Sequence, residues 1–362
     1  MNWTADPNSL KMIEALSNAK SPSGFEDETI AAARPYAEKL GEVKEDHLRN
    51  FYIRRAANTG NKPVMMLDAH SDEVGFMVHS IHENGTIRFV TIGGWNLNTL
   101  PSSKVLVRNA LGEFIPGIIA AKPVHFMSAA ERANPTLELK NLVIDVGAVS
   151  KEEAEKDFHI RIGEPIISDV QFSYDKDHDI MMGKGFDCRI GCAALLETMR
   201  RLQDEALDVD VVGVLSSQEE VGERGATVAV NTVKPNIAIC FEGCPADDTF
   251  TEPYAIQTAL KKGPMIRFMD CSVICSPRYQ RFTLDLAAEK GLSIQASVRE
   301  GGGNNGAVIN TSLDGIPVIV IGVPVRYIHS HFGITSYYDF EASVQLAVEV
   351  VKAMNAERID SF

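Results

Sequence analysis

Two adjacent glutamates, Glu219 and Glu220, follow closely on an apolar run at residues 209–215. The run is rich in valine and has the length of a buried strand. Two neighbouring carboxylates raise each other's pKa unless a cation lies between them. A metal ion that takes one carboxylate as a ligand, and leaves the other as a base, would relieve this repulsion. The pair is also typical of a solvated loop edge, so its role depends on what the other strand ends carry.

Three further predicted strands also lead into a side chain that can bind a metal. These strands and side chains are 64–67 with His70, 236–241 with Glu242, and 317–321 with His329. In an open α/β sheet, the carboxyl ends of the strands face one crevice, where ligands bind. We therefore expect residues that are far apart in the sequence to meet at one edge of the sheet.

A fifth candidate ligand, Asp187, stands just before a helix predicted from about Arg189. A carboxylate is favoured there by the positive end of the helix. Two histidines and three carboxylates give mixed nitrogen and oxygen donors, which suit zinc, cobalt or manganese better than magnesium or calcium. Two such ions, about 3.5–4 Å apart and sharing one carboxylate, can lower the pKa of a bridging water and polarise a carbonyl. A carboxylate left over would be the general base.

Each of these residues alone also has an ordinary structural interpretation. His70 could be a polar residue at a strand end, although Asp72 follows it at the spacing of a carboxylate that orients a ligating histidine. His329 and His331 could be a surface pair, of which only one binds metal. The other candidates could be loop or helix-capping residues. Their coincidence at strand ends and at a helix start favours the metal site.

The order of the predicted elements indicates an α/β fold with a doubly wound, mostly parallel sheet. Strands and helices alternate in 1–72 and 180–362, which is typical of a sheet covered on both faces. In 73–179, short apolar runs are separated by glycine and proline, which predicts a small inserted all-β unit. A charged stretch at 151–156 could be a helix within it. We predict a catalytic domain from the two outer segments, interrupted by this β domain.

The N-terminal segment predicts two helices within residues 7–40, separated by a break at 21–24. Ser23 and Glu26 have the spacing of a capping box for the second helix. Other expected helices are 191–202, 278–290 and 339–354, and other expected strands are 86–92, 105–108, 114–119, 142–146 and 293–296.

The composition is that of a globular protein with an acidic surface. The chain has 362 residues and a formal net charge of −14, which argues against nucleic acid as the main partner. No stretch approaches the roughly 20 apolar residues that cross a bilayer, and no signal peptide is visible, so we expect a cytoplasmic protein without membrane contact.

The six cysteines form three pairs, each spaced by four residues: Cys188 and Cys192, Cys240 and Cys244, and Cys271 and Cys275. The spacing resembles a disulfide or zinc framework at first sight, but the CxxC gap of common zinc knuckles is absent. Because each cysteine lies in an apolar or helical stretch, we predict free thiols that pack as small hydrophobes in a reducing compartment.

The ordered set of candidate residues resembles the dinuclear metallo-aminopeptidases of the M42 family, and most closely the tetrahedral and glutamyl aminopeptidases. The matching stretches span almost the whole chain, and they are SPSGFED (21–27), DAHSDEVGFMV (68–78), GKGFDCRIGC (183–192), SSQEEVGERGA (216–226), FEG (241–243) and RYIHS (326–330). The resemblance implies two divalent metal ions per chain, zinc or cobalt first and manganese as a further choice. It implies that Asp187 bridges the ions, that His70 and Glu242 complete one site, and that Glu220 and His329 complete the other.

The same resemblance implies that Glu219 is the general base and that Asp72 orients the first metal site. The implied activity is removal of N-terminal residues from short peptides by a water molecule that two metal ions activate. The insert at 73–179 would be a small β-barrel that serves as lid and dimerisation domain. Relatives act inside a hollow dodecamer built from dimers, so a homo-oligomer is expected by likeness.

Two other functions stay open. One is a related metal-dependent amidohydrolase or deacylase, and the other is a non-catalytic scaffold that kept the fold. The extra carboxylate of Glu219 argues against the scaffold, because a binding protein needs no spare base. Relatives have also been labelled glucanases, but glycoside hydrolysis needs two opposed carboxylates and no metal pair.

The chain departs from the resembled family at residues 303–306, which read Gly-Asn-Asn-Gly where relatives usually carry Gly-Thr-Asp-Ala. Asn305 therefore replaces an aspartate, and we expect this to remove a charge near the crevice. Arg267, Lys261 and Lys262 are candidates for a pocket that binds acidic residues, although each fits an ordinary solvated charge better. The preferred N-terminal residue and the physiological metal are left open by the sequence.

Overall fold

The computed structural model describes residues 4–133 and 137–362, which form two compact units. Unit 1 comprises the described part of Met1–Glu73 together with Phe172–Ile328 and Phe332–Phe362. Unit 2 comprises the described part of Val74–Gln171 together with His329–His331. The division into a catalytic domain and a lid stays a prediction.

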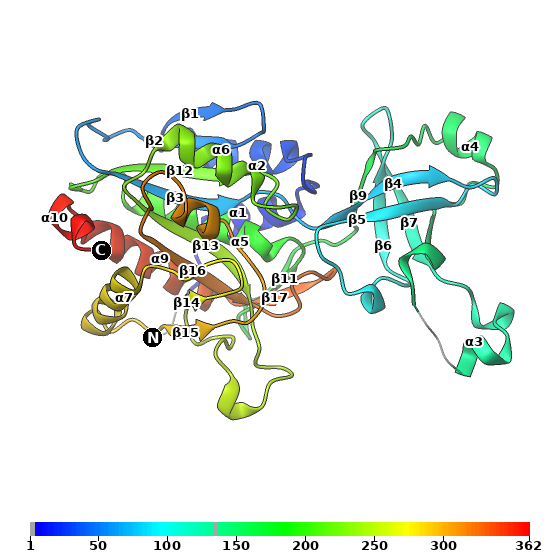
Figure 1. Cartoon of the computed structure of the whole chain (residues 1–362). Helices are drawn as coiled ribbons and strands as arrows, with labels where there is room; N and C mark the ends of the chain where they lie inside the picture. The colour runs from blue at the N-terminus through cyan, green and yellow to red at the C-terminus, as the bar shows by residue number, and fades with distance from the viewer. Residues whose placement is uncertain (1–3, 134–136) are drawn as a thin grey trace. The chain divides into compact units, whose positions relative to one another are not determined.

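Among the residues that the structure describes, unit 1 contains an eight-stranded mixed sheet in the order β1-β2-β12-β3-β13-β16-β14-β15. Its strands are β1 (Gly41–Glu45), β2 (Phe51–Arg55), β3 (Val64–His70), β12 (Asp210–Ser216), β13 (Ile237–Pro245), β14 (Met265–Met269), β15 (Gln295–Val298) and β16 (Val318–Val325). The central strands β12, β3, β13 and β16 are parallel, whereas β2 and β14 join them antiparallel (Figure 1). The predicted mostly parallel sheet is therefore confirmed.

Helices cover both faces of this sheet, as the predicted doubly wound fold requires. The helices of unit 1 are α1 (Pro7–Asn18), α2 (Asp27–Ala37), α5 (Phe186–Arg201), α6 (Arg224–Val233), α7 (Pro277–Glu289), α8 (Gly306–Asn310), α9 (Tyr337–Lys352) and α10 (Ala356–Asp360). Met65 and Leu67 of β3 pack into one apolar cluster with α1, α5 and α9. Met66, between them, packs into a second cluster with α6 and α8. Because side chains alternate along a strand, an uninterrupted apolar run is what a sheet buried on both faces needs.

The N-terminal break is confirmed, but the predicted capping box is wrong. Glu26 stands at the N-cap of α2 and forms no side-chain capping bond. Its Oε1 instead accepts from the backbone N–H groups of Gly24 at 2.7 Å and Gln218 at 3.1 Å. Ser23 Oγ donates to Asp72 Oδ2 at 2.6 Å. The hydrogen bond from the Ser23 hydroxyl to the Asp72 carboxylate is charge-assisted, so it is stronger than a bond between the hydroxyl and a backbone N–H of the helix.

Unit 2 contains a closed antiparallel barrel, which within its described residues has six strands in the order β4-β5-β8-β7-β6-β9. The strands are β4 (Gly75–Ile81), β5 (Ile87–Ile92), β6 (Lys104–Arg108), β7 (Phe114–Ala120), β8 (Val143–Asp145) and β9 (Pro165–Ser168). Phe76, Phe89, Val105 and Ile166 lie in its core. The inserted β-barrel expected from the family resemblance is therefore confirmed, and the possible helix at 151–156 is α4 (Lys151–Lys156).

Several short elements complete the described chain. They are the helix α3 (Ala129–Ala133), the single 3₁₀ turns η1 (Leu97–Thr99), η2 (Val124–Phe126), η3 (Leu139–Asn141) and η4 (Pro253–Ala255), and the small sheet of β10 (Ser173–Asp175), β11 (Ile180–Gly183) and β17 (Gly333–Thr335).

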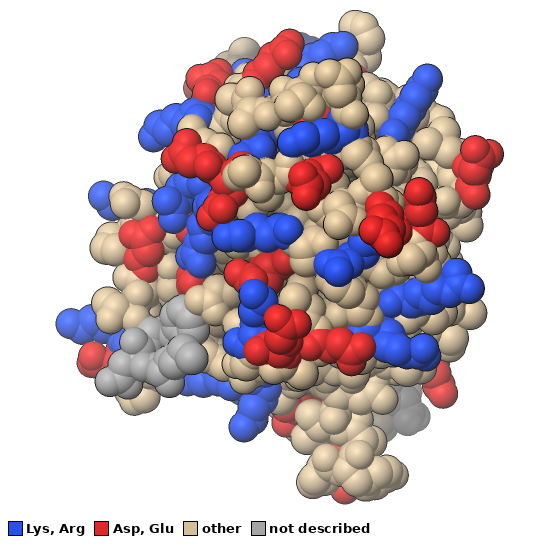
Figure 2. All heavy atoms as spheres, turned by 90° about the vertical axis from the view of Figure 1, so that its left-hand side faces the viewer, with Lys and Arg blue, Asp and Glu red and all other residues tan. Residues whose placement is uncertain are grey.

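The described surface carries charges of both signs. Figure 2 shows one face on which basic and acidic side chains of the described residues are interspersed, without a continuous field of either sign. Across residues 4–133 and 137–362, no helix is both long and apolar enough to cross a membrane. All six cysteines are free thiols, and every one except Cys271 is buried. The prediction of free thiols is confirmed.

Gly243 lets β13 approach the start of α5 closely. A Cβ atom at this position would overlap the carbonyl of Phe186 and lie 3.0 Å from the backbone nitrogen of Asp187. Because backbone atoms cannot move aside as a flexible side chain can, only glycine fits here without displacing the strand or the helix.

We expect Gly243→Ala to lower the free energy of unfolding by about 1–3 kcal/mol, since the added methyl group overpacks a buried backbone contact. Urea unfolding followed by circular dichroism measures the change. Gly301→Ala is the matched control, because nothing lies within 4 Å of a Cβ built at Gly301. Equal stability of the two variants would contradict the close approach described here.

Candidate metal centre

Six predicted site residues lie together in unit 1, at the carboxyl ends of parallel strands. His70 is the last residue of β3 and pairs in register with Ser216, the last residue of β12. Asp68 of β3 pairs with Cys240 of β13, so Glu242 lies level with His70 two residues further along. Parallel pairing therefore brings these side chains to one edge of the sheet.

The remaining members come from the loops that follow two of these strands and from the start of α5. Glu219 and Glu220 lie in the loop between β12 and α6, and Asp72 lies just after β3. Asp187 falls at the start of α5, but Asp187 and Cys188 have non-helical backbone angles, so regular helix begins at about Arg189 as predicted.

The imidazole of His70 is the centre of the group. Its Nε2 lies 3.2 Å from Asp187 Oδ1, 3.8 Å from Glu219 Oε2 and 3.8 Å from Glu242 Oε2. Its Nδ1 lies 3.3 Å from Asp72 Oδ1. One ring nitrogen thus faces three carboxylates, and a single N–H group can donate to only one of them at full strength.

Asp72 holds the loop that carries both glutamates. Its Oδ1 accepts from the backbone N–H of Glu219 at 3.0 Å, and its Oδ2 accepts from that of Glu220 at 3.2 Å. Ser23 Oγ donates to the same Oδ2. Asp72 is fully buried. Through these contacts its carboxylate links the glutamate loop, the His70 ring and the N-terminal segment. Positioning of this kind orients the groups that bind a metal.

Burial and crowding shift the protonation of the whole group. Burial raises the pKa of Glu219 to about 7, with a further contribution from the charge of Asp187. Burial, with the charges of Asp187 and Glu219, holds the pKa of Glu242 well above its usual range. Burial would by itself lower the pKa of His70, but Cys188, Glu219 and Asp187 outweigh it, so this pKa is also raised. The group therefore needs added positive charge, from protons or from metal ions.

The donor set fits divalent transition metals. His70, Asp187 and Glu220 each offer one ligand atom, and these atoms lie within 4.8 Å of one another. An imidazole with several carboxylates suits zinc, cobalt or manganese, whereas calcium and magnesium prefer oxygen alone. A cation between these groups would offset the crowding of negative charge around His70.

The seventh predicted residue, His329, belongs to unit 2 with its neighbours up to His331, and its assignment as a ligand stays a prediction. His331 lies within unit 2, where its Nδ1 is 2.7 Å from Ser168 Oγ and its ring is 5.1 Å from that of Trp95. Burial lowers the pKa of His331 to about 4. These surroundings account for His331 as a buried, neutral core residue.

One other expectation needs correction. Arg267 is not a solvated charge: it is buried, and its Nη1 lies 3.0 Å from Asp270 Oδ2, because an interior guanidinium needs a paired carboxylate. Asn305, expected near the crevice, contacts the strands β3 and β12 that lead to this group of residues. It is buried, and its Nδ2 donates to Asp68 Oδ2 at 2.7 Å and to Ser216 Oγ at 2.8 Å.

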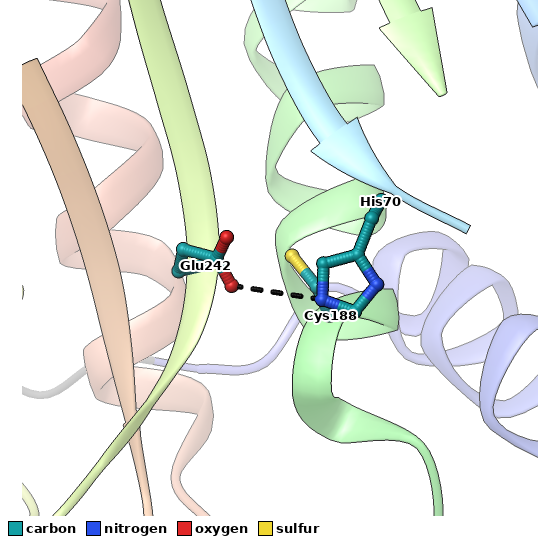
Figure 3. A group of neighbouring side chains, drawn as sticks. All are labelled: His70, Cys188 and Glu242. Atoms are coloured by element: carbon teal, nitrogen blue, oxygen red, sulfur yellow. Dashed lines mark ion pairs between the residues drawn. The ribbon is translucent and has the colours of Figure 1, made fainter. Parts of the chain in front are cut away.

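Cys188 is a member of the group that the sequence reasoning did not single out. Its sulfur lies beside His70 and Glu242 (Figure 3), and one ligand atom from each of the three lies within 4.8 Å of the others. The sequence feature that could have pointed to Cys188 is its position directly after Asp187. A cysteine in an apolar stretch fits a core residue equally well, so only the fold reveals this neighbourhood.

Comparison with known proteins gives one family. The profile of the M42 glutamyl aminopeptidase family matches residues 50–346. The chain is 30% identical over 348 residues to the glutamyl aminopeptidase of Lactococcus lactis subsp. cremoris (strain MG1363), a match that covers 96% of this chain and 97% of the relative.

Solved structures agree with this likeness. The TET aminopeptidase of Thaumarchaeota archaeon SCGC AB-539-E09 superposes with a TM-score of 0.93 and 35% identity, covering 98% of this chain and 99% of that one. The TET1 peptidase of Pyrococcus horikoshii, which can assemble into a tetrahedron or a large octahedral shell, superposes with a TM-score of 0.85 and 26% identity, covering 96% and 100% of the two chains.

We expect Asp72→Asn to weaken zinc binding by about 10–100-fold, because the neutral amide no longer holds the His70 ring and the glutamate loop as the carboxylate does. Isothermal titration of zinc into protein stripped with EDTA measures the affinity.

Asp210→Asn is the matched control. Asp210 is equally buried and accepts from the backbone of Thr59 at 2.8 Å and Gly60 at 2.6 Å, at the opposite end of β12. If both variants bind zinc as the native protein does, Asp72 has no part in the metal centre.

Proposed function

Since this chain belongs to the M42 glutamyl aminopeptidase family and is a peptide hydrolase, we propose that it removes N-terminal residues from short peptides at a centre of two divalent metal ions. The observation that carries the proposal is the buried His70 Nε2, which faces three carboxylates within 3.8 Å. Such a group is costly to bury without cations.

We assign five residues as ligands. Asp187 would bridge the two ions, with His70 and Glu242 on one and Glu220 and His329 on the other. The 3.2 Å between His70 Nε2 and Asp187 Oδ1 supports a shared cation, since two ligands about 2.0–2.2 Å from one zinc ion lie roughly 3–4 Å apart. Zinc or cobalt suits this set best, with manganese as a further choice.

When bound, two such ions lower the pKa of water and polarise a peptide carbonyl. Glu219 is assigned as the general base. Its side chain is largely buried, and its backbone N–H is held by Asp72 Oδ1. The Glu219 carboxylate takes a proton from the attacking water and passes it to the amine of the departing peptide. Asp72 is a positioning residue: it orients the His70 ring and fixes the loop of both glutamates.

The barrel of unit 2 is assigned the role of lid and dimerisation domain. The TET1 peptidase of similar fold has been solved as a dodecamer. This supports a homo-oligomer of dimers for the present chain, in which enclosed active sites would admit short peptides and exclude folded proteins.

A panel of aminoacyl-p-nitroanilides, assayed with zinc or cobalt after removal of metal by EDTA, tests the proposed function. We expect hydrolysis that EDTA abolishes and that added metal restores, because the ions supply the charge that activates water. N-acetylated versions of the same substrates are the matched control, and an aminopeptidase leaves them intact. Release of acetate from the acetylated substrates, with no release of p-nitroaniline from either set, would identify a deacylase instead.

We expect Glu219→Gln to keep the metal content of the native protein and to lower kcat by about 10²–10⁴-fold, because the amide has nearly the same shape but cannot accept the proton. Metal analysis by mass spectrometry and steady-state kinetics measure the two properties. Glu223→Gln makes the same change on the same loop, at the N-cap of α6, and serves as control. Near-native turnover of Glu219→Gln would exclude it as the base.

A further inference from the structure

Cys188 is a buried thiol inside the metal centre for which the proposed function has no role. Its sulfur, one His70 ring nitrogen and one Glu242 carboxylate oxygen all lie within 4.8 Å of one another, and all three residues are buried. Figure 3 shows the sulfur beside the imidazole ring, on the side where the 3.8 Å ion pair joins His70 Nε2 to Glu242 Oε2.

The surrounding backbone fixes the position of Cys188 Sγ. A Cβ atom at Gly191 would overlap Cys188 Sγ, so a larger residue at 191 would push the thiol out of its position. The backbone of Cys188 is not helical, with φ −116° and ψ 29°, and α5 becomes regular only after it. Cys188 Sγ donates to the carbonyl oxygen of Phe241 at 3.0 Å, and this residue directly precedes Glu242 in β13.

Cys192, one helical turn further on, shows what a structural thiol looks like in the same helix. It is equally buried, and its Sγ donates to the backbone carbonyl of His70 at 3.0 Å. Among the described residues, the groups of potential metal ligands contain Cys188 and do not contain Cys192. The two thiols therefore differ in what surrounds them, although both lie on α5.

We propose, building on the metal centre proposed above, that Cys188 Sγ is a fourth protein ligand of the cation that Asp187, His70 and Glu242 would hold. Zinc is bound in proteins by such a set of cysteine sulfur, histidine nitrogen and glutamate oxygen. A ligating thiol binds as the thiolate: the S–H bond breaks, the proton passes to solvent, and a sulfur lone pair forms the bond to the cation.

A sulfur ligand makes the two metal positions chemically unlike. The other position, to which Asp187, Glu220 and His329 are assigned above, would have only oxygen and nitrogen donors. Thiolate favours zinc, cobalt and cadmium over the hard ions manganese and magnesium. We therefore infer that the position at Cys188 retains a thiophilic ion, whereas the other position exchanges among several divalent ions.

The full-length protein loaded with cobalt(II) tests this inference by absorption spectroscopy. Sulfur ligation produces a sulfur-to-cobalt charge-transfer band in the near ultraviolet, which nitrogen and oxygen donors do not produce. We expect this band in the native protein and in Cys192→Ser, and we expect Cys188→Ser to lose it while still taking up cobalt. Cobalt bound without the band, or a band that persists in Cys188→Ser, overturns the inference and leaves the metal centre in place.

A second measurement needs no variant, in case Cys188→Ser does not fold. In the ¹¹³Cd nuclear magnetic resonance spectrum of the cadmium-loaded native protein, we expect one resonance shifted downfield by the sulfur ligand and one in the range of oxygen and nitrogen ligation. Two resonances in the oxygen and nitrogen range overturn the sulfur ligand alone. A protein that takes up neither cobalt nor cadmium overturns the metal centre and the sulfur ligand together.

Discussion

Repulsion between buried carboxylates is the constraint on which this site depends. Three carboxylates approach His70 Nε2 within 3.8 Å, and a fourth lies 3.3 Å from Nδ1. Protons alone can relieve this crowding, as the raised pKa values of Glu219 and Glu242 indicate. Divalent cations relieve it without neutralising the groups, and they leave Glu219 as a carboxylate that can accept a proton. The negative charge of the carboxylates thus makes the site costly to bury, and the same charge allows it to bind cations and to accept a proton.

The parallel sheet supplies the rigidity that such a site needs. His70 ends β3, and Glu242 lies within the neighbouring strand β13, two residues beyond the Asp68–Cys240 pair, so their separation follows from backbone hydrogen bonds rather than from flexible loops. The glutamate loop lies beyond the strand pairing. Asp72 holds it by accepting from two consecutive backbone N–H groups, at 3.0 and 3.2 Å. Gly243 completes the frame, because its missing side chain allows the start of α5 to lie against β13.

Sequence patterns revealed the central strands because these strands are apolar on both faces. The edge elements gave weaker signals: β1 alternates with charged residues, and β14 contains Arg267, whose burial depends on a partner, Asp270, that only the fold identifies. The grouping of the candidate ligands could be predicted from the sequence because the ends of parallel strands meet at one edge of the sheet. Spatial details were not readable. Ser23 has the spacing of a capping residue, yet it donates to Asp72. Cys188 fits a core position by composition, yet it lies beside His70 and Glu242, two candidate metal ligands.

Asn305 acts from behind the site. Burial raises the pKa of Asp68 to about 6, and Asn305 Nδ2 lies 2.7 Å from its carboxylate. An aspartate in the same place would set two carboxylates against each other, and one of them would have to hold a proton. The amide instead donates to Asp68 and to Ser216 at once. These two acceptors belong to β3 and β12, the strands that lead to His70 and to the glutamate loop. Asn305 therefore joins the two strands beneath the metal centre without adding a charge to a region that already has too many of one sign.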